Sequence, residues 1–454
     1  MAAQETFPVR RDGSTPAIDE AYEKMRQREI GLSRMLMLYI GTGLTFMLLP
    51  GTFLGVWNLI KISNREMANT ISPAWLQAHG HAQVFGWIGT FILGIGFHSI
   101  PRMRGGEPVA VRAARTCWAL WTTGVAMRWV TCVYGWEWRV LMPASAVLEL
   151  AAFLIFFRNV AQHKPAKQNT EKKTKFETWA KVVIGATVGM LAAVVMNLVG
   201  CFQAAIYSTT PAFTPEFDQS FLALITWGFL VLFVWGFSAK WLPIFLGLRE
   251  TRERMLVTAF LLAAVAVILG GAGAAKTGAV LTLAAAATAP LALRLFEKSA
   301  RPAKVNGVHP SYPVFIRIAY AWAIVAAALG VWAAIVNEKG VWGASRHALT
   351  GGFLAAMVFA VGQRVLPAFS GMRLLFSPRL MFAALLLLNI GCALRVSSEV
   401  LAYQEYAAWA WKVLPISAFT ELTAITLFAI NLFTTFSRPP ATQMIRIAMA
   451  KQNT

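Results

Sequence analysis

Two histidines stand at matched places in the chain, each at the start of a long apolar stretch. His81 opens the run His81-Ala-Gln-Val-Phe-Gly-Trp, and His347 opens the run His347-Ala-Leu-Thr-Gly-Gly-Phe. An imidazole is costly to keep in hydrocarbon, so its presence there indicates a task. Two imidazoles at one depth can occupy both axial positions of a haem iron and give a low-spin centre. We interpret His81 and His347 as axial ligands of a b-type haem; the alternative is two helix-end histidines bonded to backbone carbonyls.

Two further histidines are candidate metal ligands. His79 lies two residues before His81, which in a helix would place the two side chains about 200° apart. They therefore cannot serve one small site, and His79 is either an alternative haem ligand or a ligand of a second metal, for which imidazole suits copper. His98 follows His81 by 17 residues, roughly 25 Å along a helix. It is either a metal ligand near the opposite face or a core histidine.

Charged side chains recur at depths close to the histidines. Arg128 and Arg395 lie inside apolar stretches, and Arg346 stands at the start of another. A guanidinium binds a carboxylate through two parallel hydrogen bonds, so these arginines are candidates for holding haem propionates or another anion. Glu149 and Glu421 also lie in apolar stretches, where they either pair with the arginines or relay protons.

The elements that must position these residues are membrane-spanning helices. Of the 454 residues, 57% are hydrophobic and 14% charged, whereas soluble domains carry about 25% charged residues. The apolar residues fall into runs of roughly 20, the length of one helix across a bilayer. We predict an all-α polytopic membrane protein with a lipid bilayer as its surroundings. The twelve predicted spans are 34–59, 80–101, 112–134, 140–158, 179–207, 220–246, 255–275, 277–296, 314–336, 346–366, 380–400 and 410–436.

The distribution of basic residues predicts the orientation. Most of the 41 Lys and Arg lie in the two terminal segments and in the loops after even-numbered spans. Basic loops stay in the cytoplasm, so both termini, a polar segment 1–33 and a tail 437–454, are predicted to be cytoplasmic. The net charge of +20 thus has a membrane explanation, and we predict no nucleic-acid partner. The four cysteines have no metal-type spacing and are predicted to be free thiols.

The chain also repeats itself. Residues 81–101 and 347–367 both run from His-Ala to a proline 20 residues later. A third copy ends at Pro243, and the position 20 residues before that proline is Ala223. The third copy therefore keeps the scaffold and lacks the histidine.

The helices after each histidine repeat as well. Gly124-Val-Ala-Met-Arg128 matches Gly391-Cys-Ala-Leu-Arg395, and the segments 143–149 and 415–421 share the pattern Pro-x-Ser-Ala-x-x-Glu. The middle copy has Thr282 at the position of the acid. We predict three four-helix units, of which the first and third keep His, Arg and Glu. The units are 34–160, 179–296 and 314–436.

These motifs resemble the NnrS family. The resemblance rests on residues 79–87 (His-Gly-His-Ala-Gln-Val-Phe-Gly-Trp), residues 346–352 (Arg-His-Ala-Leu-Thr-Gly-Gly), the Gly-x-x-x-Arg128 ending and Glu149-Leu. It implies a twelve-span protein of the bacterial inner membrane that binds haem and copper and is tied to nitric-oxide metabolism and tolerance.

The architecture also resembles the catalytic subunit of haem-copper oxidases and nitric-oxide reductases. In those enzymes a low-spin haem lies between histidines of helices 2 and 10, which His81 and His347 match. Spans 6 and 7 here contain no histidine and span 10 has one. The resemblance therefore does not extend to the binuclear centre that reduces oxygen or nitric oxide.

We hypothesise a haem-binding, and potentially copper-binding, protein of nitric-oxide stress or denitrification. The sequence leaves open whether it turns over a nitrogen oxide, and it does not indicate the electron donor. The alternative is a cofactor-free secondary transporter of an anion or protons, with Arg128, Glu149, Arg395 and Glu421 along the path. A third hypothesis is an accessory subunit whose buried charges dock a partner.

Overall fold

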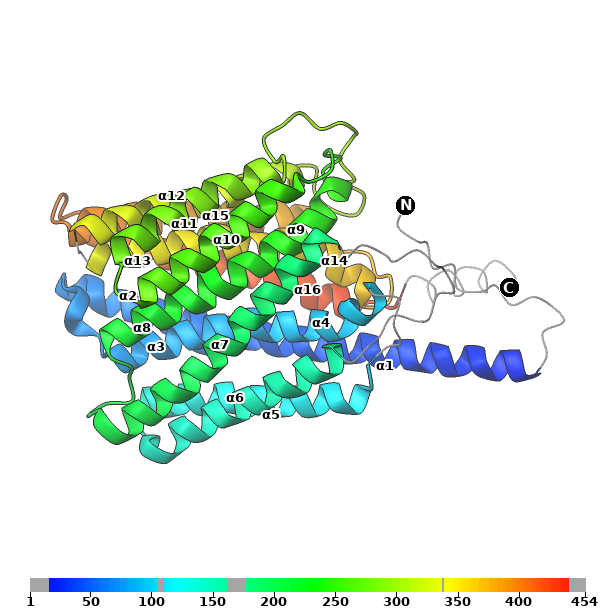
Figure 1. Ribbon diagram of the computed structural model, residues 1–454, viewed down its shortest axis with the longest axis horizontal. Helices are drawn as coiled ribbons and strands as arrows, with labels where there is room; N and C mark the ends of the chain where they lie inside the picture. The colour runs from blue at the N-terminus through cyan, green and yellow to red at the C-terminus, as the bar shows by residue number, and fades with distance from the viewer. Residues whose placement is uncertain (1–15, 104–108, 162–176, 337–338, 441–454) are drawn as a thin grey trace.

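A computed structural model describes residues 16–103, 109–161, 177–336 and 339–440, and all regular structure in these ranges is helical (Figure 1). The predicted all-α fold is therefore confirmed. The first unit comprises α1 (Pro16–Phe46), η1 (Met47–Phe53), α2 (Leu54–Arg65), η2 (Ala68–Thr70), α3 (Pro73–His81), η3 (Ala82–Gly89), α4 (Thr90–Met103), α5 (Val111–Tyr134) and α6 (Trp138–Ala161). The second comprises α7 (Thr178–Tyr207), α8 (Pro215–Ala223), η4 (Leu224–Val231), α9 (Leu232–Phe245), α10 (Glu253–Gly271) and α11 (Ala275–Ala292). The third comprises α12 (Tyr312–Val336), α13 (Lys339–His347), η5 (Ala348–Ala355), α14 (Ala356–Phe369), α15 (Pro378–Tyr403) and α16 (Ala410–Ser437).

The predicted spans all coincide with helices. Eleven helices in the described ranges are long and apolar enough to cross a membrane. The predicted span 112–134 is α5, which has 24 residues but is less apolar because it carries three arginines. The first helix begins at Pro16, so much of the predicted polar segment 1–33 is continuous with the first span, while residues 1–15 and the tail beyond residue 440 lie outside the described residues.

The threefold repeat is visible in the helices at the centre of the bundle. In each unit a nine-residue α-helix is followed by an eight-residue π-helix and a fourteen-residue α-helix. The π-helix begins directly after His81, Ala223 and His347, the three positions that the sequence aligns. Single π-turns inside α-helices are rare and frequent at functional sites. The nine-residue helices α3, α8 and α13 lie toward one end of the bundle, and α4 and α14 toward the other (Figure 1).

These histidine-bearing helices are the most enclosed of the candidate spans. Within the apolar windows, 83% of the residues are buried for Pro73–Met103 and 67% for Gly340–Phe369, against 22% for Glu253–Gly271. Around them the units close a ring, because α6 packs on α7, α11 packs on α12, and α16 packs on α2. The ring has three junctions between one unit and the next, where helices of adjacent units pack on each other, and each junction is called a gap below.

Glycines confirm the repeat at the level of packing. A Cβ atom at Gly124 would lie 2.8 Å from Cγ of Glu149, and one at Gly391 would lie 2.6 Å from Cγ of Glu421. Both contacts are closer than packed carbon atoms tolerate. Only glycine therefore allows the third helix of each outer unit to approach the acid of the fourth.

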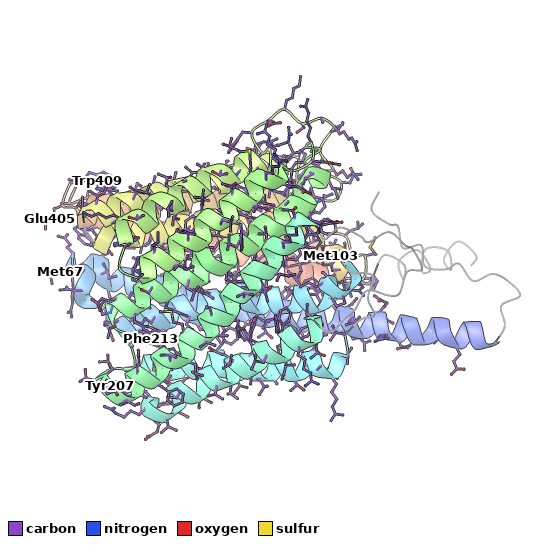
Figure 2. The ribbon with its side chains drawn as sticks, in the orientation of Figure 1. Met67, Met103, Tyr207, Phe213, Glu405 and Trp409 are labelled. Carbon is purple, nitrogen blue, oxygen red and sulfur yellow. The ribbon has the colours of Figure 1, made fainter. Side chains whose placement is uncertain are left out.

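The chain enters α3 through a standard helix start. Ser72 caps the helix by accepting a hydrogen bond from the backbone N–H of Ala74 at 3.3 Å, and Pro73 occupies the first helical position. The helix thus begins seven residues before the predicted span, which started at residue 80. His79 and His81 are both helical as a result, and they leave α3 on different sides. Figure 2 labels Met67 at this end of the molecule and Met103 at the opposite end.

Candidate cofactor site

The two histidines of α3 contact different neighbours. Nδ1 of His79 lies 2.9 Å from the carbonyl oxygen of Gly51 in η1, and Nε2 of His81 lies 2.7 Å from Oε1 of Glu149 in α6. The predicted separation of about 200° around the helix explains this divergence. His79 therefore faces the gap between the third and first units, and His81 faces the gap between the first and second.

His347 lies in the gap between the third and first units. Its Nδ1 is 2.9 Å from the carbonyl oxygen of Gly343 and 3.0 Å from Oε2 of Glu399, and its Nε2 is 3.5 Å from Nη2 of Arg395. His79 is close enough to interact electrostatically with His347 and Arg395. The structure thus brings His347, Arg395 and His79 close enough to interact, while the hydrogen bond of His81 is to Glu149.

His81 and His347 occupy matched positions in their units, each directly before a π-helix, but they have different partners. Glu149 links His81 to Asn197 of the second unit.

Both rings in the gap between the third and first units are oriented for ligation. A carbonyl oxygen only accepts hydrogen bonds, so Nδ1 of His79 and Nδ1 of His347 carry the protons. Their Nε2 atoms then present lone pairs, which is the state in which imidazole binds a metal. The side chain of His347 keeps 32% of its surface accessible although α13–α14 is among the most enclosed helices, so there is room beside the ring.

Arg395 is the candidate anion clamp of this gap. Its Nη2 lies 3.4 Å from Oε2 of Glu399, one turn further along α15. Its Nε and Nη1 are buried without a hydrogen-bond partner among the described residues. Buried N–H groups are nearly always paired, so these two donors are available to bind an acceptor such as an anion.

Glu399 is a site residue that the sequence interpretation missed. It is 3% exposed, and a Cβ atom at Gly343 would overlap its carboxylate. Comparison of the repeats does not reveal Glu399, because the matching residue of the first unit is Cys132. The four-residue spacing from Arg395 was the available signal, since such pairs meet on a helix face.

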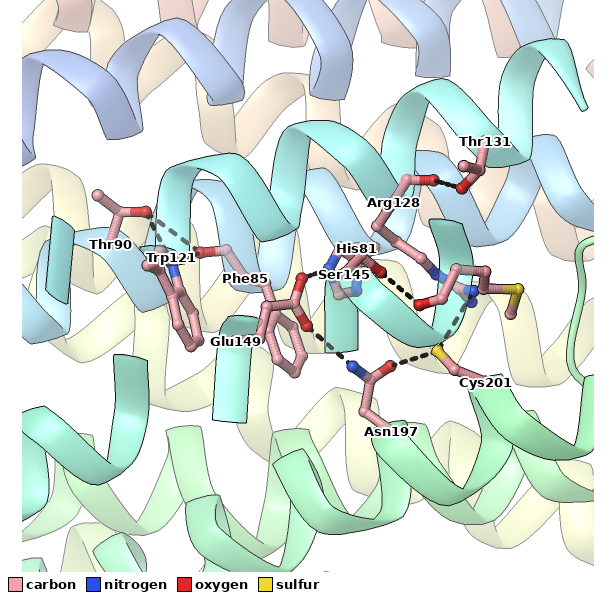
Figure 3. Close-up of polar contacts among 11 residues, drawn as sticks. His81, Phe85, Thr90, Trp121, Arg128, Thr131, Ser145, Glu149, Asn197 and Cys201 are labelled. Carbon is pink, nitrogen blue, oxygen red and sulfur yellow. Dashed lines mark hydrogen bonds and ion pairs between the residues drawn. The ribbon is translucent and has the colours of Figure 1, made fainter. Parts of the chain in front are cut away.

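The gap between the first and second units holds a closed polar network (Figure 3). Asn197 donates from Nδ2 to Oε2 of Glu149 at 2.8 Å, and Nη1 of Arg128 donates to the Cys201 sulfur at 3.6 Å. His81 is 7% exposed, Arg128 is 1% exposed, and Glu149 and Asn197 are fully buried. Tight packing distinguishes this gap from the one beside His347.

Aromatic rings enclose that network. The ring of His81 stacks on Phe85 with centroids 4.4 Å apart, and the guanidinium of Arg128 lies 4.6 Å from the centroid of Phe213. Arg128 was predicted to bind an anion or to pair with Glu149. Its contacts are the Cys201 thiol and the face of Phe213, Glu149 is close enough to interact electrostatically, and its Nε is buried without a hydrogen-bond partner among the described residues.

Charged residues at the third gap, between the second and third units, interact with charged residues of the other two gaps. Arg346 donates from Nη2 to Gln219, and the carboxylate of Asp218 interacts electrostatically with both Arg346 and Arg128. Arg346 in turn interacts with Glu399. Acids and arginines therefore alternate across the histidine end of the bundle, which keeps these buried charges compensated.

His98 and Glu421 are the two remaining candidates. His98 on α4 packs against Phe369 with ring centroids 5.0 Å apart, and its backbone carbonyl accepts a hydrogen bond from Arg102. Glu421 is partly exposed, and its carboxylate lies 3.8 Å from the Cβ position of Gly351. It also interacts electrostatically with His347, so it borders the gap between the third and first units.

The cysteines behave as predicted. All four, Cys117, Cys132, Cys201 and Cys392, are free and buried. Within the described ranges no group of three or more His, Cys, Asp or Glu side chains is gathered around one point as a metal site.

The fold and the central histidine helices define a membrane protein with the architecture of haem-copper oxidases. The chain is similar to a solved haem-copper terminal oxidase dimer at a TM-score of 0.67 and 12% sequence identity, covering 90% of this chain and 85% of that one. That likeness concerns the fold. Residues 37–439 match the NnrS protein family, and the chain belongs to that family. No curated protein sequence matches the chain.

A glycine next to His79 offers a first test of the site. A Cβ atom at Gly55 would lie 2.7 Å from Cε1 of His79. We expect Gly55→Val to push the ring out of the gap while leaving the helix formed, since valine is tolerated in helices. Circular dichroism would report unchanged helicity, and a metal or cofactor bound through His79 would be held about tenfold more weakly, as for changes to residues that orient a metal ligand. A variant that binds the metal or cofactor with wild-type affinity would contradict the position assigned to His79 in this gap.

Proposed function

We propose that this protein binds haem in the gap between its third and first units and acts in the bacterial response to nitric oxide. Membership of the NnrS family and the haem-copper oxidase fold support the class of function. The observation that carries the site is the pair of imidazoles, His79 and His347, which lie close enough to interact electrostatically and whose Nδ1 atoms each contact a backbone carbonyl.

The contacts favour His79 over His81 as the partner of His347. Nε2 of His81 is engaged by Glu149 at 2.7 Å, so ligation through that nitrogen would first require the carboxylate to leave. His79 and His347 instead each donate from Nδ1 to a backbone carbonyl, and Nε2 of His347 contacts only Nη2 of Arg395, at 3.5 Å. The predicted roles of the two α3 histidines are thereby exchanged.

The surrounding residues suit a haem in their chemistry. Arg395 offers two buried donors without partners, which fit a propionate. Glu399 would hold the Nδ1 proton of His347 and so fix the tautomer that presents Nε2. A haem with two imidazole ligands supplies one-electron chemistry at a filled coordination shell. Arg346 and Glu421 border the gap and balance its charge.

Copper, the inner-membrane location with cytoplasmic termini, and nitric oxide or a related nitrogen oxide as the partner belong to the same proposal. Their support is family membership together with the basic loops of the sequence. For copper, the contacts add His79 or His81 as an imidazole donor, and His98 is too distant along α4 to join them.

Visible spectroscopy of the purified protein tests the proposal. We expect sharp low-spin bands in the reduced protein. His79→Ala should remove these bands and leave high-spin haem on His347. His81→Gln, whose amide can still donate to Glu149, should keep them.

Two outcomes would contradict the proposal. Loss of the bands in His81→Gln with retention in His79→Ala would return the ligand role to His81. A folded, colourless wild-type protein supplied with haem would favour the cofactor-free transporter, in which the alternating charges line a path.

A further inference from the structure

We propose that His81, Glu149 and Asn197 are positioning residues that fix the rotation of α3 about its axis and thereby aim His79 into the gap beside His347. The inference rests on the proposed function, because it concerns residues that act on a cofactor ligand through the helix they share. In this proposal the three residues orient His79 and do not themselves bind a ligand.

The network is built to hold one geometry. His81 on α3 and Asn197 on α7 bind the two oxygens of Glu149 on α6, at 2.7 Å and 2.8 Å. Hydrogen bonds to a carboxylate are roughly twice as strong as neutral ones. All three side chains are buried, so breaking either bond would leave an unsatisfied polar group away from water.

Helix geometry transmits this constraint to His79. The side chains of His79 and His81 leave α3 about 200° apart, so fixing one ring fixes the direction of the other. A rotation of α3 by about 10° would move the tip of an imidazole by about 1 Å, given a Cα radius near 2.3 Å and the length of the side chain. Displacements of that size are enough to spoil a binding constellation.

The need for such an anchor follows from the short length of α3. The helix has nine residues, and a π-helix starts directly after it at Ala82. The π-helix changes the hydrogen-bond register directly after His81, so the side-chain contacts of α3 add to the continuing helix in setting the rotation of its last turn.

Asn197 shows how the second unit takes part. The second unit lacks its own histidine, yet its first helix supplies the amide that holds Glu149. A carboxylate only accepts, so Asn197 turns Nδ2 toward Glu149 and its Oδ1 toward the Cys201 thiol at 3.9 Å. The amide is thereby held from both sides.

The test compares Glu149→Leu, Asn197→Leu and Glu149→Gln with the wild-type protein loaded with haem. The readouts are the low-spin fraction in the visible spectrum, the midpoint potential and the haem affinity. We expect haem affinity to fall about tenfold in Glu149→Leu, in line with residues that orient a metal ligand. Glu149→Gln, whose amide oxygen still accepts from His81, should retain most of it. Asn197→Leu should shift the potential and lower the low-spin fraction partially.

Asn431→Leu is the matched control. Asn431 is also fully buried, and its Nδ2 donates to Oε1 of Gln363 at 2.5 Å and to the carbonyl of Ser377 at 3.0 Å. It lies on the last helix, away from α3. We expect Asn431→Leu to lower the melting temperature and leave the spectrum and potential unchanged.

Folded Glu149→Leu and Asn197→Leu proteins with wild-type spectra and potentials would overturn the positioning role alone. Should Glu149→Leu fail to accumulate, the milder Asn197→Leu decides. Equal shifts in Asn431→Leu would reduce the network to general stability. A wild-type protein that takes up no haem would remove the proposed function and this inference together.

Discussion

Replacing His347 by alanine is expected to abolish low-spin haem in the purified protein. His347 is the only described residue of the third unit that presents a free imidazole nitrogen, and the histidine of the second unit is replaced by Ala223. Residues that merely orient a ligand change metal affinity by about 10- to 100-fold, so removal of the ligand itself should cost at least as much. The low-spin bands in the visible spectrum of the reduced protein, compared at equal haem content per polypeptide, give the result.

His98→Ala is the control for that experiment. His98 belongs to the same continuous helix as His79 but packs against Phe369 at the other end. Haem content should remain at the wild-type level. Equal loss of haem in His98→Ala and His347→Ala would show that the losses reflect folding, and unchanged low-spin bands in His347→Ala would contradict its assignment as a ligand.

Replacing Arg395 by leucine is expected to have the second-largest effect, on stability. Arg395 is 5% exposed and lies 3.4 Å from Glu399, itself 3% exposed. Removing one partner of a buried ion pair leaves an uncompensated charge, which destabilises by about 3–5 kcal/mol. Thermal unfolding in detergent, monitored by circular dichroism, should show a markedly lower midpoint. Haem binding should fall as well, because the two unpaired donors of Arg395 are lost.

Arg139→Leu provides the comparison. Arg139 is exposed and donates only to backbone carbonyls, at 2.7 Å to Ala205 and 3.3 Å to Ser208. Changes of this kind alter stability by about 0.5 kcal/mol or less. If Arg395→Leu unfolds at the same temperature as Arg139→Leu, the ion pair does not stabilise the protein as described.

The helices and their repeat could be predicted from the sequence because both produce local sequence patterns. Apolar runs of the right length located the helices, and the shared Pro-x-Ser-Ala-x-x-Glu pattern located the repeat that Gly124 and Gly391 confirm by packing. The boundaries were less well predicted. Helix α3 begins at Pro73 since polar residues at a membrane surface extend helices beyond their apolar core.

The pairing of histidines could not be predicted in the same way. Matched positions in a repeat indicate equivalent environments, and we first interpreted this equivalence as a sign that His81 and His347 share one site. In the structure His81 contacts Glu149 whereas His347 contacts Glu399, and the pairing of His347 with His79 is our proposal. The direction in which a helix turns a side chain depends on packing between distant segments, which short motifs do not record.

Residues outside the repeat were missed for a related reason. Glu399 and Asn197 have no counterparts in the motifs, since Cys132 replaces the former in the first unit and the second unit was interpreted as scaffold only. Both hold a histidine in place, one directly and one through Glu149. The first unit therefore depends on Asn197 of the second unit to hold His81 in place through Glu149.

An experimental map of the haem-loaded protein by cryo-electron microscopy tests the central claim most directly. We predict planar density between Nε2 of His79 and Nε2 of His347, with a carboxylate at Arg395 and an intact hydrogen bond from His81 to Glu149. Density that touches His81 and leaves His79 bonded only to Gly51, or no density in this gap, would contradict the account.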